Sequence, residues 1–305
     1  MIAEKIRPKN PELDITIGIP TYYGGESLVQ TINGFIKHNP EDNYVIVISV
    51  DGKPLDTSVK KALKNKKVTI IENRDRTGQV GRIKQIISLC KTKYLILTQD
   101  DVIFKKRIVK EILAAFEKDP KLTMISAHVV PTKETTFFER IIHVGVNTAH
   151  YIQSRWTGGD NYLQASGRCL GFRSSMAKQF EIPNSVIDAD AYLYFLNKLH
   201  KGRFQHLYNA ICYIRSPKNL TEHLKQSKKY QLLYYELKKY LKIDIRKDYS
   251  IPLKLRLQGA FVSFLTNPVF FSLYFFILIY SRFFTKNMYM NSLGIWDTDK
   301  STKQP

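Results

Sequence analysis

The chain has 305 residues, of which 44% are hydrophobic and 24% are charged, and these are ordinary values for a folded globular protein with an ample core. Its 47 Lys and Arg residues outnumber its 27 Asp and Glu residues, so the net charge is +20. Such a surface favours polyanionic partners: nucleic acid, phosphorylated small molecules or an anionic membrane. Three scattered cysteines, Cys90, Cys169 and Cys212, exclude a disulfide framework and a zinc spacing, which suits a reducing compartment.

The first hundred residues alternate between short apolar runs, typical of buried strands, and stretches with apolar residues at helical spacing. Strands are expected over 14–20, 44–52, 67–73 and 93–101. Helices are expected over 26–36, 57–64 and 81–90. This alternation predicts an α/β fold with a doubly wound, mostly parallel sheet and helices on both of its faces.

Polar residues follow three of the predicted strands at their carboxyl ends. Thr21 and Tyr22 follow the first strand, Asp51 closes the second, and Asp100 and Asp101 close the fourth. In a doubly wound sheet, ligands bind in the crevice beyond the carboxyl ends of the strands. We therefore expect these side chains to share one crevice. Three carboxylates in one place would be unusual in so basic a chain.

The usual phosphate-binding loops are missing from this crevice. The first strand is followed by "IPTYYGGES" rather than GxGxxG, and the sequence has no GxxxxGK[ST] loop. Two adjacent carboxylates can instead hold a hard divalent cation, Mg²⁺ or Mn²⁺, which would neutralise a diphosphate. The alternative is a solvated turn with two acids, which the flanking apolar runs "YLIL" and "VIF" disfavour.

Three segments, "DITIGIPTYYGGESLVQTINGF", "VIVISVDG" and "GRIKQIISLCKTKYLILTQDDVIF", resemble in order and spacing the nucleotide-sugar-dependent glycosyltransferases of family 2, which have the GT-A fold. "QDD" stands where that family has its DxD metal motif, with Gln99 in place of the first Asp. The resemblance implies a metal contact at Asp101. It implies donor contacts at Thr21, Tyr22, Asp51, Arg76, Arg82 and Asp100.

The second half strengthens the resemblance. "ASGRCLGFRSS" (165–175) resembles the acceptor loop of the family, which implies acceptor contacts at Gly167 and Cys169. "VIDADAYLYFLNKLHKGRF" (186–204) resembles the acidic motif that opens a helix and supplies the general base. Asp190 is the first choice for that base and Asp188 the second, while helix capping alone is the competing interpretation.

A further segment, "SPKNLTEHLKQSKKYQ" (216–231), resembles the "P..L......QxxRW" motif of membrane-bound polysaccharide synthases. It implies diphosphate or acceptor contacts at Gln226, Lys229 and Tyr230, with Lys and Tyr replacing Arg and Trp. The competing interpretation is an amphipathic helix with solvated lysines. Because Lys lacks the bidentate geometry of Arg, the motif leaves processive synthesis open.

Residues 257–281 contain no charge, and about 20 apolar residues can cross a bilayer core as a helix. We expect this segment to be membrane-associated, either spanning or re-entrant with a break at Pro268, and a buried core helix is the alternative. Residues 215–256 carry twelve basic and four acidic residues. This excess, and the lack of a secretory signal at the N-terminus, predict a catalytic part that faces the cytoplasm.

The resemblance implies an inverting, metal-dependent transfer of a sugar from a nucleotide-sugar donor to a hydroxyl of a glycan or lipid-linked acceptor, and we expect a membrane but no nucleic acid as partner. The alternatives are a nucleotidyltransferase that makes sugar nucleotides and a basic membrane-surface module without catalysis. The expected segments are an extension (1–13), a donor half (14–130), an acceptor and catalytic half (131–245), a juxtamembrane and apolar segment (246–286), and a polar tail (287–305).

Overall fold

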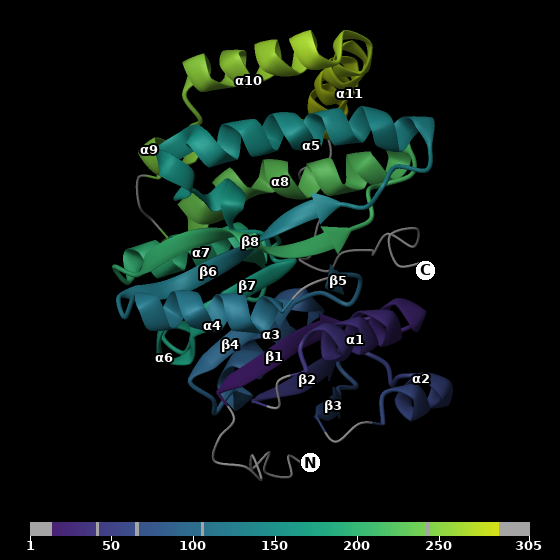
Figure 1. Ribbon diagram of the computed structural model, residues 1–305, viewed down its shortest axis with the longest axis vertical. Coiled ribbons are helices and arrows are strands. Elements are labelled where there is room, and N and C mark those ends of the chain that lie inside the picture. Colours follow the sequence, from purple (N-terminus) through teal and green to yellow (C-terminus); the bar gives the residue numbers. More distant parts are fainter. Residues whose placement is uncertain (1–13, 41–42, 65–66, 105–106, 242–244, 287–305) are drawn as a thin grey trace.

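A computed structural model describes residues 14–40, 43–64, 67–104, 107–241 and 245–286 (Figure 1). The predicted extension (1–13) and polar tail (287–305) lie outside these residues. The molecule is elongated, with the first strands at one end and the last two helices at the other (Figure 1).

Eight strands form one sheet in the order β3-β2-β1-β4-β7-β6-β8-β5. The strands are β1 (Ile15–Thr21), β2 (Tyr44–Val50), β3 (Val68–Glu72), β4 (Tyr94–Thr98), β5 (Ile103–Phe104), β6 (Leu122–Pro131), β7 (Cys169–Arg173) and β8 (Arg203–Ile214). The first four match the strands expected from sequence. They pair in parallel, β2 with β3 and β1, and β1 with β4.

The helices lie between and after these strands. They are α1 (Glu26–His38), α2 (Thr57–Ala62), α3 (Gly78–Leu89), α4 (Ile108–Lys118), α5 (Phe137–Arg155), α6 (Ser174–Ala177), α7 (Ala189–Leu199), α8 (Leu220–Leu241), α9 (Arg246–Tyr249), α10 (Leu253–Thr266) and α11 (Pro268–Lys286), with 3₁₀ turns at η1 (Trp156–Gly159) and η2 (Tyr162–Gln164). The three helices expected in the first hundred residues are confirmed as α1, α2 and α3.

Alternate side chains of the strands pack into two separate hydrophobic cores, one on each face of the sheet. Ile17 of β1 and Ile96 of β4 pack with Phe35 of α1 on one face. Leu95 and Leu97 of β4 lie on the opposite face, packed with residues of α3 and α7. Because side chains alternate along a strand, an uninterrupted apolar run is needed to fill both cores. This confirms the doubly wound arrangement expected for the donor half.

The sheet as a whole is mixed, and the expectation of parallel pairing holds for β1 to β4 and for β6 with β8. Strand β7 runs antiparallel to both of its neighbours, β4 and β6, and β5 runs antiparallel to β8. Strand β7 reaches its place after the long helix α5 and two 3₁₀ turns rather than through a right-handed βαβ crossover. The sequence in this region lacks the short strand–helix alternation that would have revealed its direction.

The apolar segment 257–281 falls in two helices rather than one. Helix α10 ends at Thr266 and α11 begins at Pro268, so the break expected at Pro268 is confirmed. Proline cannot donate the backbone hydrogen bond that would continue α10, but it is well suited to the first turn of α11. Within the described residues, none of the helices combines the length and the apolar character that crossing a bilayer requires.

Candidate functional site

The two adjacent carboxylates lie in the turn between two buried strands. Asp100 and Asp101 follow β4, and the apolar residues after them form β5, which pairs with β8. Phe104 of β5 packs edge-on against Phe35 of α1, with ring centroids 5.0 Å apart. The Thr21 hydroxyl donates a hydrogen bond to Asp100 Oδ2. Both flanks of the turn are thus anchored in the core, and the two carboxylates between them are buried.

Strand β7 brings the predicted acceptor loop over this turn. Its antiparallel register pairs Cys169 with Thr98, the last residue of β4. The Thr98 hydroxyl donates to the carbonyl oxygen of Arg168 over 2.7 Å. The loop residue before β7 therefore lies beside the residues that follow β4. Arg168 Nη1 forms an ion pair with Asp101 Oδ1 at 2.6 Å.

The same loop touches the predicted base. Asp190 lies in the first turn of α7, and its carboxylate packs directly against Gly167. A Cβ added at Gly167 would lie 2.0 Å from Asp190 Oδ1, so a side chain at this position would displace the carboxylate. Gly167 and Arg168 are neighbours in the chain. Asp190 and Asp101 therefore contact successive residues of one loop, although 89 positions separate them in the sequence.

The start of α7 is held by a helix from later in the chain. The carboxylate of Glu236 on α8 accepts hydrogen bonds from the backbone N–H groups of Ile187, at 2.7 Å, and Asp188, at 3.2 Å. Asp188 occupies the N-cap position, but its side chain makes no capping hydrogen bond. Glu236 thus satisfies backbone donors at and just before the N-cap, whereas a capping aspartate would accept from N–H groups inside the first turn.

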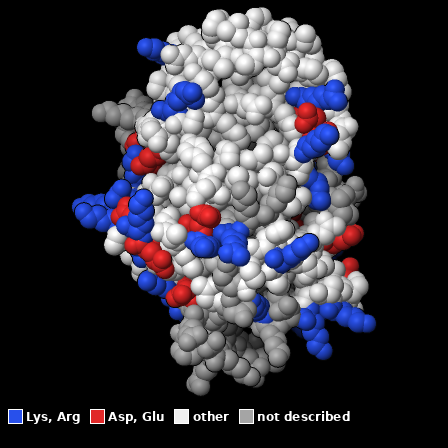
Figure 2. Space-filling view, in the orientation of Figure 1, with Lys and Arg blue, Asp and Glu red and all other residues white. Residues whose placement is uncertain are grey.

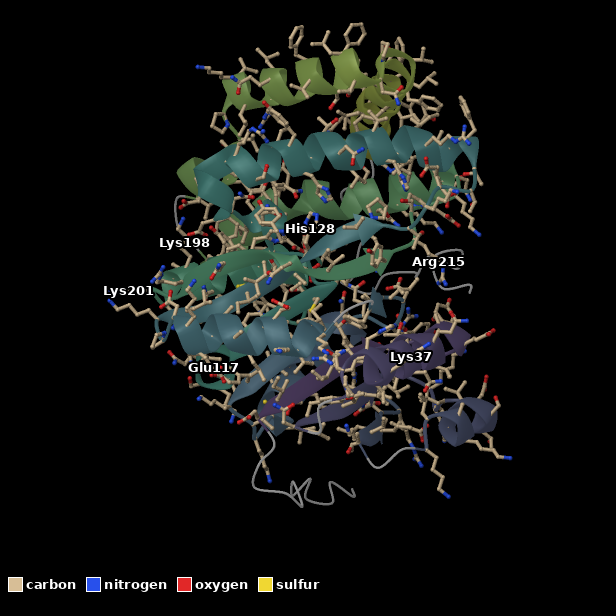
Figure 3. The ribbon with its side chains drawn as sticks, viewed as in Figure 1. Lys37, Glu117, His128, Lys198, Lys201 and Arg215 are labelled. Carbon is tan, nitrogen blue, oxygen red and sulfur yellow. The ribbon has the colours of Figure 1, made fainter. Side chains whose placement is uncertain are left out.

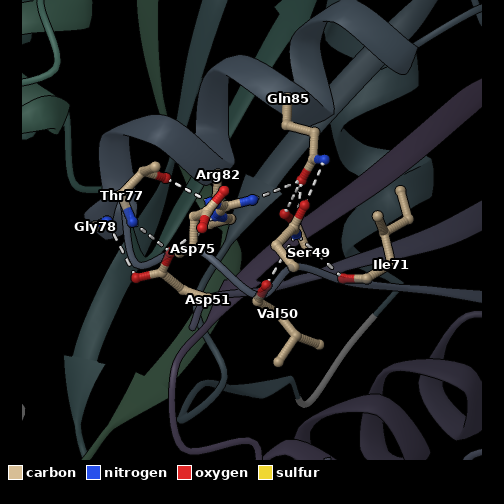
Figure 4. A network of polar contacts seen from close by, with 10 residues as sticks. Ser49, Val50, Asp51, Ile71, Asp75, Thr77, Gly78, Arg82 and Gln85 are labelled. Atoms are coloured by element: carbon tan, nitrogen blue, oxygen red, sulfur yellow. Dashed lines mark hydrogen bonds and ion pairs between the residues drawn. The ribbon is translucent and has the colours of Figure 1, made fainter. Parts of the chain in front are cut away.

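Asp51 is the centre of a buried polar network on the donor side (Figure 4). Its carboxylate accepts hydrogen bonds from the backbone N–H groups of Thr77 (2.9 Å) and Gly78 (3.0 Å) at the start of α3. Arg82 Nε donates to the same carboxylate over 2.9 Å. Gly78 has φ +77°, a conformation that favours glycine, and this turn directs its N–H toward Asp51.

Arg82 is held on every side of its guanidinium group. Nη2 donates to the carbonyl oxygen of Asp75 and to the Thr77 hydroxyl, and Nη1 donates to Gln85 Oε1. The side chains of Arg82 and Asp51 are 7% and 5% exposed, respectively. Arg82 was expected to contact base or phosphate, and in the described structure it fixes Asp51 and the start of α3.

Tyr22 and Arg76 form the outer edge of the donor side. The Arg76 guanidinium carbon lies 4.1 Å from the centre of the Tyr22 ring, within the range of a cation–π contact. Arg76 is exposed and Tyr22 is half-buried. Both remain accessible to a ligand, in contrast to Asp51 and Arg82 beneath them.

The remaining predicted contacts are placed differently. Cys169 is fully buried in the core, and burial raises the pKa of its thiol. Its thiol lies in the core near Cys212. Gln226 is half-buried on α8. The side chains of Lys229 and Tyr230, on the same helix, lie outside the described residues.

Three histidines pack behind the acceptor loop, between the sheet and α5. His128 of β6 (labelled in Figure 3) and His206 of β8 approach each other to 3.3 Å between Nδ1 and Nε2. The ring of His150 on α5 lies 5.0 Å from that of His128. Burial lowers the pKa of His206 to about 3, with further lowering from His128 and His150. Ser126 Oγ lies 2.8 Å from His206 Nδ1. These rings are therefore neutral at physiological pH.

A divalent cation is implied by the resemblance, and the residues at the turn fit one. Asp100 and Asp101 offer hard carboxylate oxygens at the edge of the crevice. Among the side chains that the structure describes, no three His, Cys, Asp or Glu are grouped so that they could hold a metal ion. Mg²⁺ is commonly held by one or two carboxylates together with substrate phosphates, so two carboxylates are a suitable protein contribution.

Two residues of the site were not identified from the sequence. Arg168 lies in the predicted acceptor loop, and it is the only cationic residue in the sequence between Arg155 and Arg173. The motif gave it no predicted role. Glu236 lies on α8 among lysines and tyrosines and carries no local signal of its contact with α7. Both act through contacts made across the tertiary structure.

Comparisons with known proteins agree on the class of fold. The family model described as glycosyl transferase family 2 matches residues 16–180. A type 2 glycosyltransferase from Zymoseptoria tritici (strain CBS 115943 / IPO323) is 30% identical over 114 residues, which are 36% of this chain and 24% of the relative. The chain thus aligns with about a quarter of that relative's length.

Two solved structures share the fold. The mannosyltransferase PcManGT from Pyrobaculum calidifontis, in complex with GDP-Man and Mn²⁺, has a TM-score of 0.56 and 12% identity, covering 92% of this chain and 76% of that chain. S. aureus TarS has a TM-score of 0.52 and 13% identity, covering 74% of this chain and 40% of that chain. At these identities the likeness concerns the fold alone, which is of the GT-A type with a mixed sheet flanked by helices.

Proposed function

The chain belongs to glycosyl transferase family 2 and is a glycosyltransferase, and from this premise we propose that it transfers a sugar from a nucleoside-diphosphate sugar to a hydroxyl group with inversion at the anomeric carbon. The acceptor that we propose is a glycan or a lipid-linked sugar. The family match decides against the two alternatives left open by the sequence, a nucleotidyltransferase and a non-catalytic module.

One observation carries the proposal. The carboxylates of Asp101 and Asp190 touch neighbouring residues of a single loop, Arg168 and Gly167. A transfer reaction needs positive charge near the leaving diphosphate and a base near the acceptor hydroxyl, with the anomeric carbon between them. Arg168 of the loop supplies the positive charge, and Gly167 next to it contacts the carboxylate of Asp190 on α7.

In the proposed reaction, Asp190 removes the proton of the acceptor hydroxyl as its oxygen attacks the anomeric carbon. The new carbon–oxygen bond forms on the face opposite the diphosphate, and the bond to the diphosphate oxygen breaks. Arg168 carries positive charge next to Asp101, at the side where the leaving group departs. When bound at Asp100 and Asp101, a divalent cation would supply further charge to the diphosphate.

The donor half would hold the nucleoside. Asp51 is oriented by two backbone N–H groups and by Arg82, so its carboxylate has one fixed position. Tyr22 and Arg76 offer a ring and a cation at the accessible edge. Because these groups are already ordered, binding a nucleotide would require little reorganisation of the protein.

The identity of the donor can be tested with a panel of nucleotide sugars. Binding and hydrolysis of each donor should be measured by calorimetry and product analysis, with Mn²⁺ or with a chelator. GDP-Man is a sensible first member, because the similar fold of PcManGT is known with GDP-Man and Mn²⁺. We expect one donor to bind in a metal-dependent manner, and Asp101→Ala should weaken that binding. The absence of binding by any nucleotide sugar would contradict the proposal.

The role of Asp190 is tested by Asp190→Asn, which removes the base but keeps the size and polarity of the side chain. We expect turnover to fall by about 10²–10⁴-fold while donor affinity is unchanged. Asp188→Asn is the matched control, since Asp188 is buried at the preceding N-cap. A larger loss of turnover in Asp188→Asn than in Asp190→Asn would reverse the assignment of the base.

A further inference from the structure

Helices α10 and α11 both pack on α5 and expose large apolar side chains on their other side. Gly259 of α10 approaches Ile152 of α5 so closely that an added Cβ would lie 2.8 Å from its side chain. Ser263 of α10 hydrogen-bonds to Thr148 of α5 over 2.7 Å. On α11, Tyr274 packs against Gly145 of the same helix α5. Their contact with α5 therefore fixes which side of each helix faces outward.

The outward side carries large apolar residues at helical spacing. Phe261, Phe276 and Phe283 are 62%, 68% and 74% exposed. The outer apolar face consists of Leu257, Phe261, Leu265, Val269, Phe276 and Phe283. A soluble surface helix normally has the opposite arrangement, with its apolar stripe toward the core. So large an exposed apolar surface usually marks an interaction site.

Basic residues border the outer apolar face, and acids are missing from the segment. Lys254 and Arg256 lie at the start of α10, and Arg282 lies near the end of α11. The sequence contains no Asp or Glu from residue 249 to residue 296. Figure 2 shows this end of the molecule mostly free of charge, with Lys and Arg side chains toward its margin. An apolar surface with a basic margin matches a bilayer whose headgroups are anionic.

We propose that the outer apolar face docks on an anionic membrane surface, with α10 and α11 lying along the interface and their inner sides still packed on α5. A second copy of the chain is the competing occupant. It would bring one basic margin against another, and like charges across an interface are unfavourable. This proposal refines the membrane association expected from the sequence, and it does not depend on the proposed reaction.

The docking would place the acceptor half next to the membrane. Helix α5 lies between the two outer helices and the sheet, whereas the donor strands β1, β2 and β3 lie at the far end of the molecule (Figure 1). A lipid-linked acceptor at the bilayer would then enter from the side of the acceptor half. A soluble nucleotide sugar would reach the donor half from the opposite end.

Binding to vesicles tests the proposal directly. The full chain should be incubated with vesicles of phosphatidylcholine alone or mixed with phosphatidylglycerol, and bound protein should be separated by flotation. We expect binding to the mixed vesicles that weakens as salt is added, because surface charges are screened. Absence of binding to either vesicle would overturn the proposal.

Two sets of variants separate the apolar and the charged contributions. Phe261→Ser with Phe276→Ser should weaken binding to mixed vesicles by about a hundredfold, since each ring contributes about tenfold. Lys254→Glu with Arg256→Glu should remove the preference for phosphatidylglycerol. Leu199→Ser, an exposed apolar residue at the end of α7, is the matched control and should bind like the unchanged chain.

Two further measurements distinguish the competing outcomes. Sedimentation equilibrium should give the same oligomeric state for the unchanged chain and the double phenylalanine variant. A dimer that the double variant dissociates would assign the face to a second copy and overturn the proposal. Donor binding in solution should be equal in both proteins, so a loss of vesicle binding would be distinguishable from a failure of the proposed reaction.

Discussion

The donor half and the acceptor half of the molecule are built in different ways. In the donor half, Asp51 and Arg82 are 31 positions apart and are joined by consecutive strand and helix elements. Arg168 of the acceptor half meets Asp101 of the donor half across 67 positions, and Asp190 contacts the neighbouring Gly167. The donor side is thus a closed network of buried partners, whereas the catalytic side is assembled from distant segments around one loop. We expect the Asp51–Arg82 network to contribute mainly to stability, and the contacts around Gly167 and Arg168 to contribute mainly to the reaction.

The largest effect should come from breaking the closed network with Arg82→Met. Because this change leaves a buried carboxylate without its ionic partner, we expect a loss of about 3–5 kcal/mol in the free energy of unfolding. Chemical denaturation gives this value, and donor affinity should fall with it because Asp51 loses its fixed position.

Lys84→Met is the matched control for Arg82→Met. Lys84 lies on the same helix but is exposed, and its contact is a hydrogen bond to Asn184 at the surface. Its removal should change the free energy of unfolding by no more than about 0.5 kcal/mol. If Arg82→Met and Lys84→Met lowered the free energy of unfolding equally, the buried Asp51–Arg82 pair would contribute no more to stability than a surface contact.

A smaller effect is expected at the assembled loop. Arg168→Lys keeps a positive charge near Asp101 but loses the planar geometry of the guanidinium group. We expect kcat/KM to fall by about tenfold, which corresponds to about 1.4 kcal/mol, with a larger loss in Arg168→Met. Steady-state kinetics with varied donor separates the change in kcat from the change in KM.

Higher activity in Arg168→Lys than in Arg168→Met would indicate that the reaction uses the positive charge of Arg168 beside Asp101. If Arg168 had only a structural role, Arg168→Lys and Arg168→Met would both lower stability, and their kcat/KM values would not differ in this way. Lys178→Met, an exposed change in the same half of the molecule, should leave the kinetics unaltered. Unchanged kinetics in Arg168→Met would remove Arg168 from the proposed reaction.

The last prediction concerns the half-buried His206 of the acceptor half. Burial lowers the pKa of His206 to about 3 from an ordinary value of 6.5. Between these values the unfolded chain binds a proton that the folded chain does not, so the free energy of unfolding decreases as the pH falls below 6.5. One proton contributes at most about 1.4 kcal/mol per pH unit.

Urea denaturation between pH 7 and pH 5 measures this dependence. His206→Asn removes the titrating group, and the decrease in stability on acidification should become correspondingly shallower. An identical pH dependence in the variant and the unchanged chain would show that His206 does not carry it. The donor network should be unaffected, which donor binding at each pH can report.

Much of the donor half could be predicted because its signals are local. Uninterrupted apolar runs identified the strands, and helical spacing identified α1, α2 and α3. Parallel strands joined through helices place their carboxyl ends at one edge, so Asp51 and Asp101 could be expected to share a crevice. The pairing of Arg82 with Asp51 could not be predicted, because a sequence does not show where a long side chain points.

The acceptor half required the tertiary structure. The direction of β7, and with it the contact between Arg168 and Asp101, depends on pairing with strands far away in the sequence. The segment boundaries and the orientation of the catalytic part toward the cytoplasm stay predictions. The outward apolar faces of α10 and α11 follow from their packing on α5, whereas the sequence alone indicated only an apolar segment with a break at Pro268.

By itself, the sequence determined the class of enzyme and the donor-half elements, because motif order and hydrophobic periodicity are properties of neighbouring residues. Only the tertiary structure decided which partners Asp51 and Asp101 have, where Cys169 points and which side of the last helices faces outward. These depend on contacts between segments brought together by the sheet, and such contacts leave no periodic trace along the chain.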